Sequence, residues 1–316
     1  GALSWGVLDA LLEDGQWRFD GVSGTSAGAM NAVALAHGFA KAAHEHKDPH
    51  EAHLAGCALA RETLTRLWEG VGTLGSLMWG APLAAANPMM GLMRQWLSPY
   101  QTNPLDINPL RRLLEREVDF DLLCSARRAA HAAGGPQVFV CATNVRTGRG
   151  EIFSGQRLSA DAVMASACLP RLHRSVMIDG QPHWDGGFAA NPAVYPLLLD
   201  CRAHDVLLVM LSPLKWAQTP QSASDIDQRM TELAFNATFL REMRMFAHLG
   251  ERVGRIAWWR RGPMERRLTR ARFHAIEPHE RMLALDSGTK AAASQRFFET
   301  LFELGREQGL AWLRAH

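Results

Sequence analysis

The segment 20–36 (DGVSGTSAGAMNAVALA) constrains the fold of this chain more than any other stretch. Residues 19–22 have the pattern of a short strand, and residues 27–39 are rich in alanine with apolar positions at helical spacing. The pentapeptide GTSAG joins them, and such a G-x-S-x-G turn needs small residues because its flanking segments pass close together. We therefore expect a strand-turn-helix unit that presents the hydroxyl of Ser26 outside the backbone.

The helix after Ser26 would point the positive end of its dipole at this hydroxyl, so an anion formed there would be stabilised. The pentapeptide alone is weak evidence, because about one chain in ten of this glycine content and length would contain it by chance. Its position between a strand and a helix favours a nucleophilic serine over a plain structural turn.

Composition limits the classes of function. A chain of 316 residues with 47% hydrophobic and 21% charged residues is globular, and it can form one large α/β domain or two small ones. The formal net charge of +2 provides no overall field that would attract nucleic acid. No stretch reaches about 18 uninterrupted apolar residues, so we expect no membrane-spanning helix.

Cysteine and histidine patterns argue against a metal centre. The five cysteines are an odd number without C-x-x-C spacing, which indicates reduced thiols in a cytosol-like compartment. A weak metal site at His44, His46, His50 and His53 is less favoured than a solvated, charged linker. We expect no metal, no cofactor and a cytoplasmic location with peripheral membrane contact. The chain opens without an initiating methionine, which leaves a signal peptide and secretion open.

The rest of the chain alternates between strand and helix patterns. Two hairpins are expected, one joining 137–144 to 151–153 and the other joining 176–178 to a strand that ends at Asp185. A helix at 159–169 lies between them, and residues 206–211 form a continuous apolar run typical of a strand covered on both faces. This alternation predicts an α/β sheet layered between helices.

Residues 70–109 follow a predicted helix at 51–68 and are apolar but repeatedly interrupted by glycine and proline. Two interpretations explain this segment about equally well. It is either a buried loop excursion, or a flexible, methionine-rich cap or insert over an apolar site. In the second interpretation, the stretch from Met78 to Trp96, with Trp79, would line an apolar binding site or dock on a membrane.

The C-terminal part, 225–316, is expected to be largely helical. A long helix at 225–253 carries an apolar stripe that core burial would explain, and the last helix carries an apolar face that would dock on the domain. Between them, Trp258 and Trp259 precede a group of arginines. A solvated loop is favoured there over contact with anionic lipid headgroups.

A serine hydroxyl needs a base before it can act as a nucleophile. An α/β hydrolase would place a histidine late in the chain, and His274 and His279 are the candidates. Asp185 is better placed, because it ends a predicted strand and is followed by Gly186 and Gly187, which let another backbone approach closely. A carboxylate in a dry pocket can serve as a general base, although a turn or a helix cap would explain Asp185 as well.

Two motifs together, Gly24-Thr25-Ser26-Ala27-Gly28 and Asp185-Gly186-Gly187, resemble the signature of patatin-like phospholipases. Four further segments resemble a bacterial branch of that family: residues 5–9 (WGVLD), 21–24 (GVSG), 142–148 (ATNVRTG) and 165–170 (ASACLP). The similarity extends from Gly1 to the last helix. It implies one patatin-like domain over 1–316 with a three-layer α/β/α fold and a mostly parallel central sheet. It also implies a dyad of Ser26 as nucleophile and Asp185 as general base, without histidine.

One departure from the family concerns the oxyanion hole. The family carries a glycine-rich loop, G-G-G-x-[RHK]-G, ahead of this region, and only its last glycine is present here, as Gly1. Loss of one oxyanion donor costs about a hundredfold or more in rate. A truncated chain is less favoured than one whose first strand and loop precede this sequence, because removing a central strand exposes a sheet edge. The residues expected to support the motif or the oxyanion are Gly1, Gly24, Ala27, Gly28, Gly186 and Gly187.

The resemblance implies hydrolysis of fatty-acyl esters in phospholipids or related lipids, with a lipid or acyl ester as substrate. Two alternatives stay open at this point: a Ser-His-Asp esterase on small soluble esters, and a catalytically silent lipid- or membrane-binding module. A nucleic-acid partner is not expected, because the basic cluster is local and lacks a binding motif.

Overall fold

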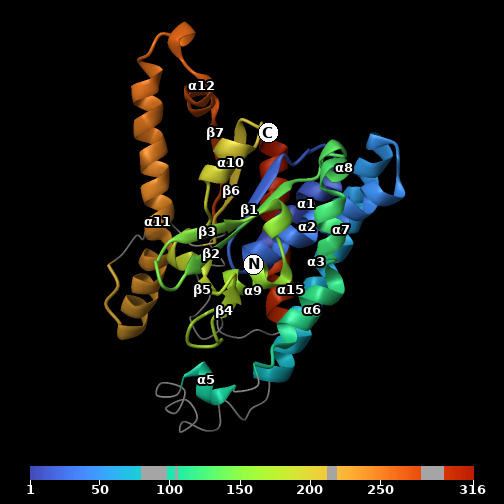
Figure 1. Ribbon diagram of the computed structural model, residues 1–316, viewed down its shortest axis with the longest axis vertical. Coiled ribbons are helices and arrows are strands. Elements are labelled where there is room, and N and C mark those ends of the chain that lie inside the picture. The colour runs from blue at the N-terminus through green and yellow to red at the C-terminus, as the bar shows by residue number, and fades with distance from the viewer. Residues whose placement is uncertain (80–97, 104–105, 212–218, 279–294) are drawn as a thin grey trace.

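The computed structural model describes residues 1–79, 98–103, 106–211, 219–278 and 295–316 (Figure 1). The strands are β1 (Gly21–Gly24), β2 (Gln137–Asn144), β3 (Gly150–Phe153), β4 (Val176–Ile178), β5 (Gln181–Asp185), β6 (Asp205–Val209) and β7 (Arg272–Ile276). The helices before β2 are α1 (Ala2–Asp14), α2 (Ala27–Glu45), α3 (Pro49–Trp79), α5 (Pro99–Thr102), α6 (Pro109–Glu117), α7 (Phe120–Ser125) and α8 (Arg127–Ala132). The later helices are α9 (Ala160–Ser166), α10 (Tyr195–Asp200), α11 (Ala223–Gly254), α12 (Pro263–Arg270) and α15 (Gln295–Ala315).

Strand β2 is the centre of a five-stranded sheet. It pairs in parallel with β1 and antiparallel with β3 and β5, and β4 completes the order β1-β2-β5-β4. Strands β6 and β7 form a separate parallel pair. Both predicted hairpins are confirmed, and the described sheet is mixed, with parallel pairing between β1 and β2.

The register on β2 brings two strand ends together. Gly24, the last residue of β1, lies opposite Val140, and Asp185, the last residue of β5, lies opposite Ala142. Because β1 runs parallel and β5 antiparallel to β2, the two strands approach each other end to end along it. The turns after β1 and β5 therefore meet beside the same short section of β2.

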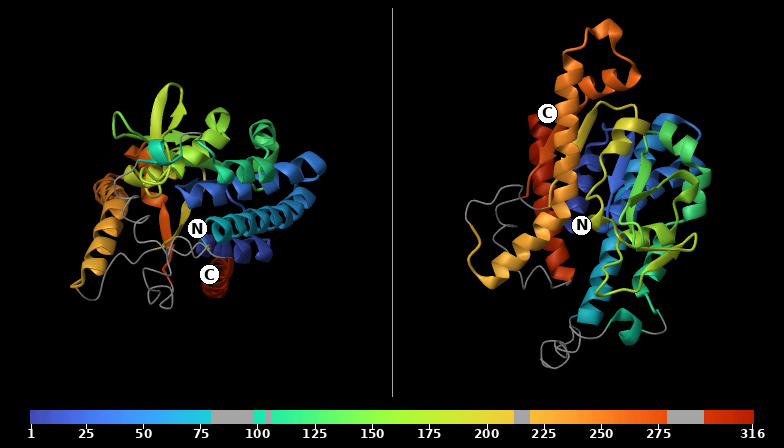
Figure 2. Two further views of the ribbon diagram at one scale, coloured as in Figure 1. Left: turned by 90° about the horizontal axis from the view of Figure 1, so that it is seen from below. Right: turned by 60° about the vertical axis from the view of Figure 1, so that its left-hand side comes forward.

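Helices cover both sides of the strands. Helix α11 stands on one side of the sheets, and α1, α2 and α3 lie on the other, with α15 against α1 (Figures 1 and 2). This is the three-layer α/β/α arrangement that was predicted. Helix α2 is buried from Ala29 to Ala40, which explains its alanine content, because small side chains let a helix pack against neighbours all round.

Helices α1 and α15 cross with unusually close backbones. A Cβ at Gly6 would lie 2.0 Å from the carbonyl oxygen of Phe302, and a Cβ at Gly305 would lie 2.0 Å from that of Leu3. Arg306 of α15 also pairs with the buried carboxylate of Asp9 on α1. The predicted docking of the last helix is confirmed, and glycines set its distance from α1.

The predicted end of the helix at residue 68 is wrong. Helix α3 continues to Trp79 and includes Gly70, Gly72 and Gly75. Gly70 is a contact point, because a Cβ there would lie 2.4 Å from Cδ1 of Leu113 in α6. Tertiary packing therefore overrides the low helix propensity of glycine here. Residues 80–97 lie outside the described part of the chain, so the predicted cap from Met78 to Trp96 remains a prediction.

The predicted long helix at 225–253 is confirmed as α11, but the burial of its apolar stripe is confirmed only in part. Leu240 and Met243 are half-buried and pack against a core cluster around Phe239. The N-terminal part of the stripe is exposed, at Ile226, Met230, Leu233 and Ala237. None of the described helices combines the length and apolar character needed to cross a bilayer.

Candidate active site

Ser26 occupies a strained turn between β1 and α2. Its backbone has φ 57° and ψ −122°, a region that L-residues other than glycine rarely adopt. Gly24 is required for this geometry, because a Cβ there would lie 2.3 Å from the carbonyl oxygen of Gly28. Strain of this kind persists where the surroundings fix the backbone, and it concentrates at functional sites.

The close approach in the turn was expected to need small residues at both motif glycines, but Gly28 has room for a side chain. A Cβ built at Gly28 meets no atom within 4 Å, so this position faces open space. Its N–H donates to the carbonyl oxygen of Thr25 at 2.9 Å, within the turn. The close approach in the pentapeptide is therefore made at Gly24 alone.

Three hydrogen bonds fix the elbow from outside. The N–H of Ser26 donates to Oγ of Ser166 at 2.9 Å, and Ser166 is completely buried at the end of α9. The hydroxyl of Thr25 donates to the carbonyl oxygen of Ala190 at 2.9 Å, and that of Ser23 donates to Ala193 at 2.6 Å. The elbow is thus held by α9 and by the segment that follows Asp185. Ser166 lies in the ASACLP segment, and no local pattern in the sequence indicates its role.

Asp185 is held from both its backbone and its side chain. Its N–H donates to the carbonyl oxygen of Cys168 at 2.8 Å, and its own carbonyl oxygen accepts from the Thr143 hydroxyl at 2.8 Å. Its Oδ1 accepts the N–H of Gly187 at 2.7 Å, and the residue is 1% exposed. The carboxylate is therefore buried and fixed in direction.

The two glycines after Asp185 lie where side chains would not fit. A Cβ at Gly186 would lie 2.1 Å from the carbonyl oxygen of Cys141 in β2, and one at Gly187 would lie 2.2 Å from the Phe235 ring of α11. The expected close approach of other chain segments at this turn is present.

Ser26 and Asp185 are brought together. Burial raises the pKa of the Asp185 carboxyl above its usual range, while the Gly187 N–H and the Ser26 hydroxyl act as hydrogen-bond partners that lower it. Oδ2 of Asp185 is buried and has no hydrogen-bond partner among the described residues. Catalytic hydrogen bonds are often long without substrate and tighten when substrate binds.

Backbone N–H groups gather beside Ser26. Ala27 begins α2, and its N–H donates to no acceptor among the described residues, as is usual in the first turn of a helix. The start of α1 lies next to it, since a Cβ at Gly1 would come within 2.7 Å of the Ala27 Cβ. Asn31 donates to the Gly1 carbonyl oxygen at 3.0 Å and accepts from the Trp68 indole at 2.7 Å. The N-termini of α1 and α2 therefore lie side by side, and α2 begins directly after Ser26, which favours an anion there.

The candidate histidines have other partners. Nε2 of His274 lies 2.9 Å from the Asp205 carboxylate, across the β6–β7 pair. His279 lies outside the described residues. The ring of His183 is buried on β5 and faces Glu151, at 3.5 Å, and Phe153. No described histidine has Ser26 among its contacts.

The histidine-rich linker and the cysteines form no metal centre in the described part of the chain, where no three metal-binding side chains gather. Both ring nitrogens of His53 lie within 2.9 Å of backbone carbonyl oxygens, those of Ala133 and Gly15. All five cysteines are free thiols.

Comparison with known proteins agrees with this geometry. The family model described as patatin-like phospholipase matches residues 1–198, which is more than half of the chain and spans α1 to α10 with both motifs. Among curated proteins, no match was found. The match to the family model shows that the chain belongs to the patatin-like phospholipase family.

Proposed function

We propose that this protein is a serine acyl hydrolase that cleaves fatty-acyl esters of phospholipids or related lipids, with Ser26 as nucleophile and Asp185 as general base. Family membership supports lipid acyl hydrolysis in general. The observation that carries the dyad is a buried Asp185 carboxylate beside the strained turn at Ser26, with an Oδ2 that has no hydrogen-bond partner among the described residues.

In the proposed reaction, Asp185 accepts the proton of the Ser26 hydroxyl as its oxygen attacks the ester carbonyl carbon. The resulting oxyanion is stabilised by backbone N–H groups, among them that of Ala27. The intermediate collapses to an acyl-serine, and the leaving alcohol takes the proton from Asp185. A water molecule then gives a proton to Asp185 as its oxygen attacks the carbonyl carbon of the acyl-serine. The bond from that carbon to the Ser26 oxygen breaks, the fatty acid leaves, and Asp185 returns the proton to the Ser26 oxygen.

Apolar side chains near the Asp185 turn support an acyl substrate. Phe188 follows the turn and is exposed, and so is Leu169, which follows the residue that accepts the Asp185 N–H. Exposed apolar groups around a polar catalytic pair suit a ligand with an apolar tail.

The Ser-His-Asp alternative is weaker, because His274 is engaged by Asp205 and the described histidines have no contact with Ser26. Acyl release from phosphatidylcholine and from a short-chain ester tests the proposal. We expect the wild type to release acyl groups, Ser26→Ala to release none, and Asp185→Asn to lose about a hundredfold or more. Retention of turnover in Asp185→Asn, with loss in His274→Ala, would favour the alternative. Lipid binding without acyl release would favour a silent binding module.

A further inference from the structure

Helix α11 carries one continuous, exposed stripe along its outer side. Its nine members follow each other at intervals of three or four residues, so they lie on one helix face. We call them the outer stripe: Ile226, Met230, Leu233, Ala237, Arg241, Arg244, His248, Arg252 and Arg255. All nine are exposed. The helix lies at the edge of the molecule, away from α1, α2 and α3 (Figure 2).

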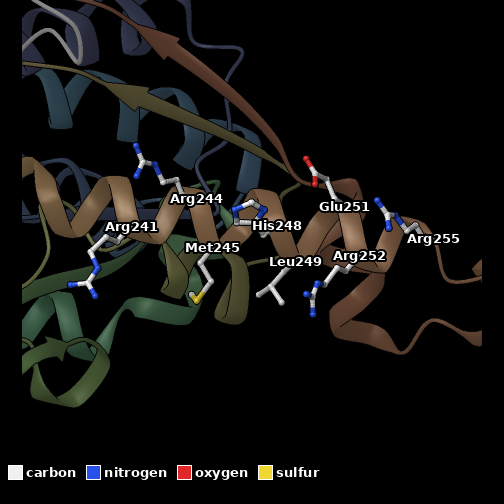
Figure 3. Close-up of a pocket in the computed structure, with 8 residues that line it drawn as sticks. All are labelled: Arg241, Arg244, Met245, His248, Leu249, Glu251, Arg252 and Arg255. Carbon is white, nitrogen blue, oxygen red and sulfur yellow. The ribbon is translucent and has the colours of Figure 1, made fainter.

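The two halves of the outer stripe differ in chemistry. The first half is apolar, and Met230 is 64% exposed. The second half is cationic, and its residues line an open groove of about 730 Å³ together with Met245 and Leu249 (Figure 3). Of the eight described residues that line this groove, Glu251 alone is acidic. Among described residues, no ion pair neutralises the stripe arginines, which are therefore available to an external anion.

Two exposed tryptophans follow α11 in the chain. Trp258 is 72% exposed and Trp259 68%, and their rings meet edge to face at 5.8 Å. Arg260 follows them and is exposed. Large aromatic rings beside arginines are typical of the boundary between lipid headgroups and acyl chains.

The opposite side of α11 is fixed to the candidate active site. The Phe235 ring covers Gly187 and lies 5.3 Å from the Phe188 ring. The Glu242 carboxylate accepts the N–H groups of Val194 and Tyr195 at 2.6 to 3.2 Å. Whatever binds the outer stripe is therefore held at a constant distance from the Asp185 turn.

Three kinds of occupant can be compared by their chemistry. A second copy aligned in parallel would place arginine against arginine, and an antiparallel copy would place arginine against the apolar half. Nucleic acid would leave Ile226, Met230 and Leu233 without apolar contacts. An anionic bilayer offers phosphate and carboxylate groups to the arginines and acyl chains to the apolar half.

We propose that the outer stripe of α11, with Trp258 and Trp259, is a docking surface for anionic lipid bilayers. The inference goes beyond the proposed hydrolase activity and does not depend on it. Each arginine near an anionic surface strengthens partition by about fivefold, so four of them are worth on the order of a hundredfold or more. The attraction weakens with added salt, because salt screens charges near the surface.

The test uses full-length Ser26→Ala protein, so that hydrolysis cannot change the lipids. Its flotation is measured with phosphatidylcholine vesicles that contain about one third phosphatidylserine, and with pure phosphatidylcholine vesicles. The stripe variant carries Arg241→Gln, Arg244→Gln, Arg252→Gln and Arg255→Gln. The matched control loses four exposed arginines elsewhere: Arg112→Gln, Arg128→Gln, Arg149→Gln and Arg202→Gln. Both variants lose the same net charge, and circular dichroism checks that both fold.

We expect the parent protein to bind the anionic vesicles and not the neutral ones at physiological salt. The stripe variant should lose binding by about a hundredfold or more, and the control should stay within about threefold of the parent. A second variant, Met230→Ser with Leu233→Ser, should lose about tenfold while its charge is unchanged.

The proposal is overturned if the parent fails to bind anionic vesicles, or if the stripe variant and the control lose binding equally. It is also overturned if the stripe variant changes only the oligomeric state or only the affinity for RNA. Acyl release from a short-chain soluble ester, measured on the same substitutions with Ser26 intact, should stay within about twofold of wild type. Failure of the proposed hydrolase activity can therefore be distinguished from failure of the proposed membrane docking.

Discussion

The N–H of Ser26 donates a 2.9 Å hydrogen bond to the hydroxyl of Ser166, which lies 140 positions later in the chain and is completely buried. The bond ties the strained elbow to the end of α9. It satisfies the backbone donor of Ser26, so the elbow can hold a positive φ without leaving that donor unpaired.

Removing this acceptor should disturb the elbow more than the rest of the fold. Ser166→Ala leaves the Ser26 N–H without its partner, at a cost of about 1–3 kcal/mol in the free energy of unfolding. We expect acylation of Ser26 to slow by about tenfold or more, because the hydroxyl is no longer fixed toward Asp185. Ser125→Ala, at an exposed serine in α7, is the control. The rate at which a fluorophosphonate labels Ser26 measures this effect. Equal labelling rates in both variants would show that Ser166 does not position Ser26.

The pH dependence of catalysis should report the buried carboxyl. Burial raises the pKa of Asp185 above the usual carboxyl value of 3.8, and the proposed base can accept a proton only when it is ionised. The acid limb of kcat/KM should therefore have its midpoint above that value. An acid limb at the usual value would contradict a buried base.

The raised pKa of Asp185 also predicts how the stability of the protein depends on pH. Catalysis needs the ionised carboxylate, whereas folding favours the protonated form. Because its pKa is higher in the folded than in the unfolded state, its contribution to stability is present below the unfolded pKa. That contribution is lost as pH rises through the folded pKa. Near neutral pH, Asp185→Asn should therefore leave the melting temperature unchanged or raise it. A clear loss of stability would mean that the ionised carboxylate stabilises the fold.

The two glycines of the elbow should respond differently to alanine. Gly24→Ala places a Cβ 2.3 Å from the carbonyl oxygen of Gly28, and we expect it to lower the free energy of unfolding by about 1–3 kcal/mol or to prevent folding. Gly28→Ala meets open space in the first turn of α2, where alanine is favoured. Chemical denaturation of both variants measures the difference, and an equal loss in both would contradict the described turn.

The crossing of α1 and α15 offers a test away from the site. Gly305→Ala would place a Cβ 2.0 Å from the Leu3 carbonyl oxygen and force the helices apart, at about 1–3 kcal/mol. Gly250→Ala, on α11, meets nothing within 4 Å and serves as control. Thermal unfolding should separate the two variants by several degrees. If both unfold at the same temperature, the close crossing is absent in solution.

Local patterns in the sequence predicted the parts of the site that depend on local geometry. The elbow requires glycine at position 24 and the turn after β5 requires glycine at position 186. Both glycines belong to short motifs that can be recognised in the sequence, G-x-S-x-G and Asp-Gly-Gly. The hairpin of β4 and β5 was likewise predictable, because Asp179 and Gly180 form its tight turn. That Asp185 ends beside Ser26 follows from the register on β2, which no local pattern contains.

Features that depend on distant contacts were not predictable. Helix α3 passes through Gly70 because Leu113 packs against it, and the sequence around Gly70 suggests a break. The apolar period of α11 predicts a face but not what covers it, so Met230 was expected to be buried and is exposed. Ser166 has no motif of its own, because its role comes from a hydrogen bond across the fold.

The most direct test of the central claim is fluorophosphonate labelling with peptide mapping, in the wild type, Asp185→Asn and His274→Ala. We predict a single adduct on Ser26 in the wild type, an unchanged rate in His274→Ala, and a rate lower by about a hundredfold in Asp185→Asn. An adduct on another residue, or an unchanged rate in Asp185→Asn, would contradict the Ser26–Asp185 dyad.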